Sequence, residues 1–362
     1  MIYLFFAAIS AISIFIGILI ASIPYVARPD IVFGVRLNRN VYQSPLIRSM
    51  KMENCVYVLL ISSIFSGAFL LGSTYVPTFI FALTPMLELV PMFLVYFHFR
   101  SKTLRIKEEM ADVEDQKKIS AFVPVVNNRI SNIWYFLPWI EIIIFVMVGV
   151  EYYPYIPDKM AIHFGINGQA NAFAAKSILS VFSLLLFVAA PLTAFFDLLS
   201  FSLLRVRSNA NTSTPKTSST QMKGFNKGIA KLLAVINAIV VFSMFLGSLL
   251  MWNVLPPGYS HILVLPVFII LPIVLFFIFK NGQGGWKLYP GLKEKEDESI
   301  VRDDDGEWTG GLIYHNKDDS SLLVPKRYGV GYTFNFSNKL SWIILILLLA
   351  LPVLAIYLAS LM

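Results

Sequence analysis

The sequence predicts an all-α polytopic membrane protein with about eight transmembrane helices and a small cytoplasmic β-rich module before the last helix. Of its 362 residues, 57% are hydrophobic and 14% are charged, whereas soluble domains average about half and about a quarter. Eight segments contain the roughly 20 mostly apolar residues that a spanning helix requires. Loops rich and poor in lysine and arginine alternate along the chain, which is typical of multi-pass proteins.

The expected spans divide the chain into two membrane parts. The first part, 1–207, contains five helices, with the external loop 151–176 between the fourth and the fifth. Ser208–Thr220 is rich in Ser, Thr and Asn and predicts a flexible cytoplasmic linker, which we extend over 208–228. The second part holds two helices in 229–280, and the last helix occupies 340–362. The predicted spans are Ile2–Ile23, Asn54–Tyr75, Val76–His98, Asn132–Val150, Ser177–Leu204, Ile229–Asn253, Ser260–Phe279 and Leu340–Leu361.

The basic residues predict the orientation. The loops after the first, third, fifth and seventh spans carry 5, 7, 6 and 9 of the 29 lysines and arginines, and the other loops carry only Lys159 and Lys176. This distribution predicts a multi-pass protein with both termini outside and with 151–176 external. The net charge of +7 comes from these short loops between apolar runs, so the positive-inside rule explains it. The expected partner is therefore the lipid bilayer, and no nucleic-acid partner is expected.

The segment 281–339 is long enough to fold as a small module before the last helix. Gly311–His315, Leu322–Pro325 and Tyr332–Phe336 predict three short strands separated by turn residues. We expect them to form a minimal antiparallel sheet. Because three strands are about the least that can be stable, this sheet should lean on the membrane domain.

Two glutamates lie where hydrocarbon is expected. Glu88 is near the middle of the third span and Glu141 near the middle of the fourth, where a charge costs about 2.5–3.5 kcal/mol. Pro85 and Pro91 each lie three residues from Glu88. Pro138 lies three residues before Glu141, so each carboxyl group shares a helix face with a proline. We hypothesise a shared polar pocket with at least one carboxyl protonated, and the alternative is a structural hydrogen bond between helices.

Two other polar residues lie within the expected spans. Asp197 is about 30 Å along its helix, so a solvated position close to the inner interface is favoured. We interpret Asn237 as an ordinary polar contact between helices.

His163 is the only histidine in the expected external loop. With Asp158 as its nearest acidic neighbour in sequence, it provides too few ligands for a metal site. The glycines Gly165 and Gly168 indicate a tight loop around it. His163 could therefore be a pH-sensitive contact or could hydrogen-bond the loop.

The sequence lacks the patterns of common catalytic sites. It contains no His-Glu-x-x-His zinc helix, no Gly-x-Ser-x-Gly elbow and no Gly-x-x-x-x-Gly-Lys phosphate loop. Cys55 is the only cysteine, which excludes an intrachain disulfide and a cysteine-based zinc cluster. The acidic run Asp303–Glu307 lacks the spacing of a calcium loop and favours a solvated turn. We expect no enzymatic activity, metal or cofactor.

The external loop resembles a known motif. Ile156-Pro157, His163-Phe164, Gly165, Gly168 and Lys176 are similar to a pattern in a domain of unknown function shared with bacterial SdpI-type immunity proteins, where it also connects two membrane spans. The chain departs from the pattern at Asn171-Ala172, where an Asp-Gly turn is usual. The resemblance implies ligand or partner binding by His163, Phe164, Gly165, Gly168 and Lys176.

The segment before the last span resembles a second uncharacterised domain, which accompanies the first in Firmicute-type membrane proteins. Phe33–Arg36 is also similar to a Phe-Gly-Ile-Arg element of SdpI-type proteins. The positions that carry the second resemblance are Tyr314, Asn316, Pro325, Lys326, Arg327, Gly329, Gly331 and Asn335.

These resemblances imply a bacterial plasma-membrane protein of a largely uncharacterised family, which gives immunity to a secreted toxic peptide or senses it. Its outer loop would contact the peptide, and its basic inner surface could hold a cytoplasmic regulatory protein. The alternative is a proton-coupled secondary transporter that uses Glu88 and Glu141. A membrane enzyme ranks last because no catalytic constellation is present.

Overall fold

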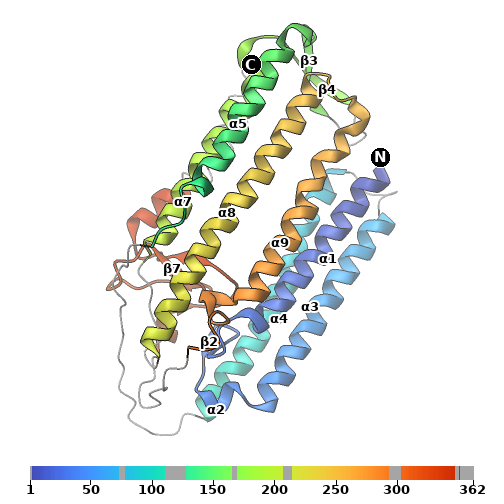
Figure 1. The fold of residues 1–362 in the computed structure, drawn as a ribbon. Coiled ribbons are helices and arrows are strands. Elements are labelled where there is room, and N and C mark those ends of the chain that lie inside the picture. Colours follow the sequence, from blue (N-terminus) through green and yellow to red (C-terminus); the bar gives the residue numbers. More distant parts are fainter. Residues whose placement is uncertain are drawn as a thin grey trace.

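The computed structural model describes residues 2–72, 78–110, 128–164, 169–206, 214–292, 303–346 and 350. Figure 1 shows long helices that run side by side through most of the molecule. Within the described residues, six helical segments are long and apolar enough to cross a membrane, which confirms a multi-pass membrane protein. These segments are Ile9–Val26, Pro45–Leu71, Ile133–Tyr155, Ile178–Leu204, Pro215–Met251 and Pro257–Gly285.

The expected count of eight spans is not confirmed. The third expected span falls within α4 (Thr78–Glu109), whose 32 residues are long enough, at about 1.5 Å per residue, to cross a bilayer. The eighth begins as a helix at residues 339–346, and most of it lies outside the described residues. The structure therefore supports six spans by length and composition, and the other two stay predictions.

Small polar side chains bring the first two long helices together. α1 (Ile2–Val26) packs along α3 (Pro45–Gly72), and α4 covers both. Ser10 of α1 hydrogen-bonds Ser66 of α3, and the Ser62 hydroxyl donates to the Ser13 carbonyl at 2.8 Å. Small residues at such spacing let helix backbones approach closely in a membrane. The short α2 (Arg39–Tyr42) precedes α3.

A second group contains α5 (Ile133–Tyr152), α7 (Ala190–Leu204) and α8 (Pro215–Met251). α6 (Ile178–Ser183) and the π-helical turn η2 (Leu184–Ala189) lead directly into α7. Pro191 follows this turn and has no N–H to complete a regular α-helical ladder, which accounts for the widened turn. The core of this group includes Val181, Leu185 and Trp252.

The helix α8 corrects the expected linker over 208–228. It starts at Pro215, so the last two thirds of that segment are helical, while residues 207–213 lie outside the described part of the chain. Proline is a favoured residue in the first turn of a helix. The 37 residues of α8 extend over about 55 Å, well beyond the roughly 30 Å of a hydrocarbon core.

The helix that follows α8 joins the two helix groups. The 3₁₀ segment η3 (Pro257–Val264) follows α8, and α9 (Leu265–Asn281) packs on both α8 and α1. Within the second group, the Asn237 amide donates to the Thr193 hydroxyl at 3.1 Å. The prediction that Asn237 is a polar contact between helices is confirmed.

The described strands form four separate antiparallel pairs. In the module before the last helix, three of the strands match those expected, but they do not form one continuous sheet. The strand β5 was not expected, and β6 and β8 meet only through a bridge between Tyr314 and Asn335. The pairs are β1 (Ile31–Val32) with β2 (Val35–Arg36), β3 (Lys159–Phe164) with β4 (Ala170–Ala175), β5 (Trp308–Thr309) with β6 (Ile313–Tyr314), and β7 (Leu323–Pro325) with β8 (Tyr332–Phe334).

We predict that Gly17→Ala destabilises the protein by about 1–3 kcal/mol. A Cβ atom at Gly17 of α1 would overlap the Cβ and Oγ of Ser62. Because the Ser62 Cβ is fixed to the backbone of α3, the two helices would have to separate. Gly67→Ala is the matched control, since a Cβ there meets no atom within 4 Å and alanine favours the helix.

The measurement is thermal unfolding of the full chain in detergent. Equal melting temperatures for the two variants would show that the α1–α3 contact is not close.

Candidate functional site

The β3–β4 hairpin projects from one end of the helix bundle (Figure 1). It follows α5 through the 3₁₀ turn η1 (Tyr153–Tyr155) and leads into α6. Ile156 and Met160 are buried in the core of the second helix group, next to Trp252. The Lys176 ammonium closes the base of the hairpin, because it donates to the Ile156 carbonyl at 2.8 Å and lies over the Tyr153 ring. One side of the hairpin is thus fixed on the bundle.

The other side of the hairpin is exposed and largely apolar. The Phe173 side chain is 49% exposed and lies beneath the Lys159 ammonium. Ile162 is also exposed, at the irregularity in strand register between Ala161 and His163. Tyr155 of η1 is 81% exposed. Side chains alternate between the two faces of a strand, so burial of Met160 sets Lys159 on the exposed face. The hairpin therefore presents aromatic, aliphatic and cationic groups together.

The residues predicted to bind a ligand here have different environments. His163 is exposed, and its Nδ1 hydrogen-bonds the Asn171 side chain across the hairpin, which is the loop contact that the sequence left open. Phe164 is half-buried at the end of β3, and Lys176 holds the hairpin base. Gly165 and Gly168 lie outside the described residues.

Glu88 lies in the first helix group. Its side chain is fully buried, and its Oε2 accepts a hydrogen bond from the Ser13 hydroxyl at 2.6 Å. The second oxygen, Oε1, has no hydrogen-bond partner among the described residues. Ser62 of α3 donates in turn to the Ser13 carbonyl at 2.8 Å. Glu88 thus belongs to a polar cluster shared by α1, α3 and α4.

Glu141 lies in the second helix group instead. It is on α5, which packs against α7 and α8, and its Oε2 is buried without a partner among the described residues. The structure does not bring Glu88 and Glu141 together, because α4 and α5 pack in different groups. The expected pocket shared by the two carboxyl groups is wrong. Nearby on α7, Asp197 is half-buried and accepts a hydrogen bond from the Trp139 indole at 2.8 Å, whereas a solvated position was expected.

A buried ion cluster lies at the opposite end of the bundle, where the C-terminal module (residues 303–338) meets the β1–β2 hairpin. Arg327 is 2% exposed and donates to Asp304 and to Asp305. Arg36 of β2 bonds Asp304 at 2.9 Å. Lys107 of α4 bonds Asp305 at 2.7 Å. We call Arg36, Lys107, Asp304, Asp305 and Arg327 the module junction.

Glycines allow the module junction to close. Phe33 and Gly34 form the tight turn between β1 and β2, and both have positive φ, 46° and 73°, as a two-residue hairpin turn of this type requires. Gly311 also has positive φ, and a Cβ at Gly34 would lie 3.0 Å from its Cα. The Arg327 guanidinium donates to the Gly34 carbonyl at 3.1 Å, and the Tyr96 hydroxyl donates to that of Gly310 at 2.8 Å.

The remaining predicted residues stabilise the module itself. Asn335 is fully buried, and its amide donates at 2.8 Å to the carbonyls of Asn316 and Asp319. The Tyr314 hydroxyl donates to the Asp319 carboxylate at 3.0 Å. Burial together with the charge of Asp319 raises the pKa of Tyr314, so this hydroxyl stays protonated. Pro325 ends β7, opposite Tyr332.

A glutamine that the sequence did not single out holds the β7–β8 turn. Gln283 lies in η4 (Gln283–Gly285), directly after α9, and is 1% exposed. Its amide nitrogen donates to the carbonyls of Lys326 and Gly331, and its oxygen accepts from the Gly331 N–H at 2.7 Å. Gly329 and Gly331 have φ near 100°, which favours glycine. In the sequence, the only indication of this contact was the cluster of glycines around Gln283, at positions 282, 284 and 285.

The acidic run Asp303–Glu307 was expected to be a solvated turn, but two of its carboxylates face buried arginines. Burial raises the pKa of Asp305, but Arg327 and Lys107 outweigh burial and leave this pKa below its usual value. Burial likewise raises the pKa of Asp30, and Arg28 and Arg36 lower it further than burial raises it. No group of three or more potential metal ligands occurs in the part of the chain that the structure describes.

We predict that Arg327→Gln destabilises the module junction by about 3–5 kcal/mol, because Asp304 and Asp305 lose their most buried cationic partner and keep only Arg36 and Lys107. Limited proteolysis and thermal unfolding of the full chain measure the effect. Lys317→Gln is the matched control, since Lys317 lies in an exposed turn of the same module. Equal protease resistance of the two variants would contradict a stabilising junction.

The same variant has a predicted pH dependence. The pKa values of Asp30 and Asp305 are lowered by folding, so their stabilisation is present above the unfolded value of about 3.9 and is lost as the pH falls through their folded values. Acid should release the wild-type module. Arg327→Gln should reduce the part of this dependence that comes from Asp305 and leave the part that comes from Asp30, whose pKa Arg28 and Arg36 lower.

Two segments of the chain match known families. Residues 140–188 match a family described as Domain of unknown function (DUF1648), and residues 317–342 match one described as Family of unknown function (DUF5808). The first match includes most of α5, the β3–β4 hairpin and α6, and the second includes β7 and β8. No curated protein and no solved structure matches the chain. The two expected domains of unknown function are confirmed, and the likeness to SdpI-type immunity proteins stays a prediction.

Proposed function

We propose that this chain is a bacterial plasma-membrane protein that recognises a secreted, membrane-active peptide and either protects the cell from it or senses it. The β3–β4 hairpin is the recognition element in this proposal. The C-terminal module and the extended part of α8 form the inner surface, where a cytoplasmic regulatory protein binds.

The proposed orientation has the hairpin outside and the module inside. The hairpin end carries Lys159 and Lys176, whereas the module end carries the ion cluster and most of the basic loops. The positive-inside rule favours this arrangement. It places the start of α1 outside, and the last span, if it crosses the membrane, returns the C-terminus to the outside.

The exposed hairpin surface is the observation that carries the proposal. Phe173 remains exposed although the opposite face of the same hairpin is packed on Trp252 and its neighbours, and Tyr155 and Ile162 are also exposed at this end of the bundle. A peptide that acts on membranes combines apolar side chains with charge, and aromatic anchors on a fixed backbone bind such partners at a small entropic cost. The location at the membrane surface is where the peptide would arrive.

The proposed inner partner is supported by a basic face on α8. Lys216, Lys223 and Lys227 are spaced by seven and four residues, which places them on one side of the helix. This part of α8 precedes the apolar core of the span. An acidic patch on a cytoplasmic protein would complement it.

We predict that Phe173→Ser and Tyr155→Ser reduce protection to the level of a gene-deleted strain. Both side chains are exposed, so the fold should be retained while apolar contacts with the peptide are lost. Ile313→Ser is the control, because Ile313 is similarly exposed but lies on the module. Survival of strains with each variant is measured across a panel of secreted membrane-active peptides, with protein levels checked in parallel.

His163→Ala should have a smaller effect, since His163 orders the hairpin through Asn171. If no peptide distinguishes the deletion strain from a strain that overexpresses the protein, the proposal is wrong.

Buried polar groups in the first helix group favour a second candidate, a proton-coupled transporter. Glu88 is fully buried beside Ser13, and Asn54 of α3 is fully buried with no partner for its amide among the described residues. Asn54 and Ser62 are eight residues apart on α3, or about 12 Å along the helix axis. Proton uptake by proteoliposomes that is lost in the Glu88→Gln, Glu141→Gln double variant would favour transport. Protection that survives this double variant favours peptide recognition.

A further inference from the structure

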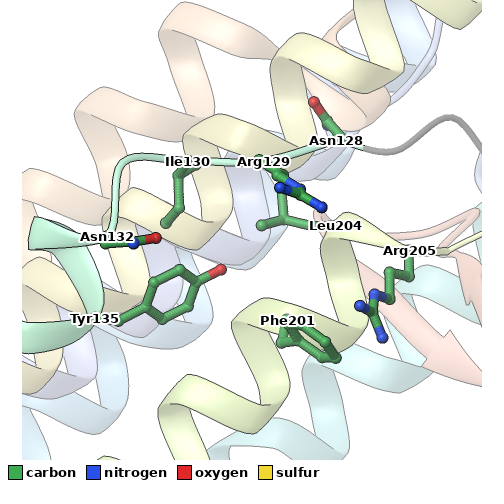
Figure 2. Close-up of a pocket in the computed structure, with 8 residues that line it drawn as sticks. All are labelled: Asn128, Arg129, Ile130, Asn132, Tyr135, Phe201, Leu204 and Arg205. Carbon is green, nitrogen blue, oxygen red and sulfur yellow. The ribbon is translucent and has the colours of Figure 1, made fainter.

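A pocket of about 200 Å³ lies between the start of α5 and the end of α7, apart from the hairpin surface and the module junction. Figure 2 shows the Tyr135 hydroxyl and the Arg129 guanidinium pointing into the space between these elements, with Arg205 beside Phe201. The pocket is lined by Asn128, Arg129, Ile130, Asn132, Tyr135, Phe201, Leu204 and Arg205.

The position of the pocket matches the level of lipid headgroups. α5 begins at Ile133, beside the pocket, and its 20 residues end next to the β3–β4 hairpin. At about 1.5 Å per residue this helix covers about 30 Å, which is the thickness of a hydrocarbon core. The pocket therefore lies at the membrane boundary on the module side, where phosphate groups of phospholipids are found.

The polar groups of the pocket suit a phosphate. The Arg205 guanidinium stacks on the Phe201 ring, with Cζ 3.5 Å from the ring centroid. Stacking occupies the faces of the guanidinium plane and leaves its N–H edge to bind two phosphate oxygens. Arg129, the Tyr135 hydroxyl and the Asn132 amide add donors on the other sides.

The acidic residue closest in sequence to this cluster does not neutralise Arg205. Asp197 lies two turns before Arg205 on α7 and is bonded by the Trp139 indole. No carboxylate among the described residues forms an ion pair with Arg205. The charge of Arg205, at the end of α7, is therefore left for an anionic ligand.

We infer that this pocket binds the phosphate headgroup of an anionic phospholipid in the leaflet on the module side. Phe201, Leu204 and Ile130 supply an apolar wall for the glycerol and the first acyl carbons, which inorganic phosphate could not use. Bound lipid would join the ends of α5 and α7 opposite the hairpin. This inference depends on the membrane placement and not on recognition of a peptide.

The test uses the purified full chain in detergent, titrated with short-chain phosphatidylglycerol, phosphatidylcholine or inorganic phosphate. Thermal stabilisation reports binding, because a ligand that binds the folded state raises the melting temperature. Arg129→Gln with Arg205→Gln should weaken phosphatidylglycerol binding by about 30-fold, given about 1 kcal/mol for each arginine. Arg205→Lys keeps the positive charge but loses the planar guanidinium. Its loss of phosphatidylglycerol affinity should be smaller than that of the double variant.

Lys280→Gln is the matched control. Lys280 also lies over a phenylalanine one turn earlier, Phe276, at the end of α9, but it lines no part of this pocket. Its phosphatidylglycerol binding should equal that of the wild type. Phosphatidylcholine should raise the melting temperature of the wild type and of Lys280→Gln less than phosphatidylglycerol does.

Three results would overturn the inference. These are phosphatidylglycerol binding that both arginine variants leave unchanged, stabilisation by phosphatidylcholine equal to that by phosphatidylglycerol, and displacement of the lipid by millimolar inorganic phosphate. The last result would assign the pocket to free phosphate. If the double variant does not fold, the comparison of Arg205→Lys with Lys280→Gln decides the question.

Discussion

The buried contact of Arg327 with Asp304 and Asp305 lies within the C-terminal module, and the same two carboxylates bind cations from the first part of the chain. Arg36 of the first hairpin also bonds Asp304, and Lys107 of α4 also bonds Asp305. Buried carboxylates are costly unless they are paired and hydrogen-bonded, so these partners must come together when the chain folds. Close approach of Gly34 and Gly311 makes the contact sterically feasible. The position of the C-terminal module relative to the membrane helices therefore depends on this junction.

The long helices hold the β3–β4 hairpin and the C-terminal module at opposite ends of the bundle. α5 runs from the arginine pocket to the β3–β4 hairpin, and Met160 fixes the hairpin on the same core that contains Trp252. At the module end, Gln283 connects α9 to the β7–β8 turn. In the proposed function, a peptide bound at the hairpin would act on the module end through these packed helices.

The sequence was sufficient for features that depend on composition and on local pattern. Apolar length predicted the six spans that the described residues support, and the β7–β8 pair of the module agrees in position with Leu322–Pro325 and Tyr332–Phe336. Long-range partners could not be predicted. Glu88 and Glu141 have the same local pattern, but the packing of α4 and α5 into different groups separates them. The role of Asp304 depends on Arg36 and Arg327, which lie 268 and 23 residues away. A single sequence gives no signal for such a contact.

The central claim is that the β3–β4 hairpin and the module junction face opposite sides of the membrane, with the hairpin outside. Cys55 is the only cysteine, so Cys55→Ser provides a background for single labels at Phe173→Cys on the hairpin and Asp318→Cys on the module. A membrane-impermeant maleimide applied to intact cells should label the first, and should label the second only after permeabilisation. Labelling of both positions from the outside, or of Asp318→Cys alone, would contradict the account.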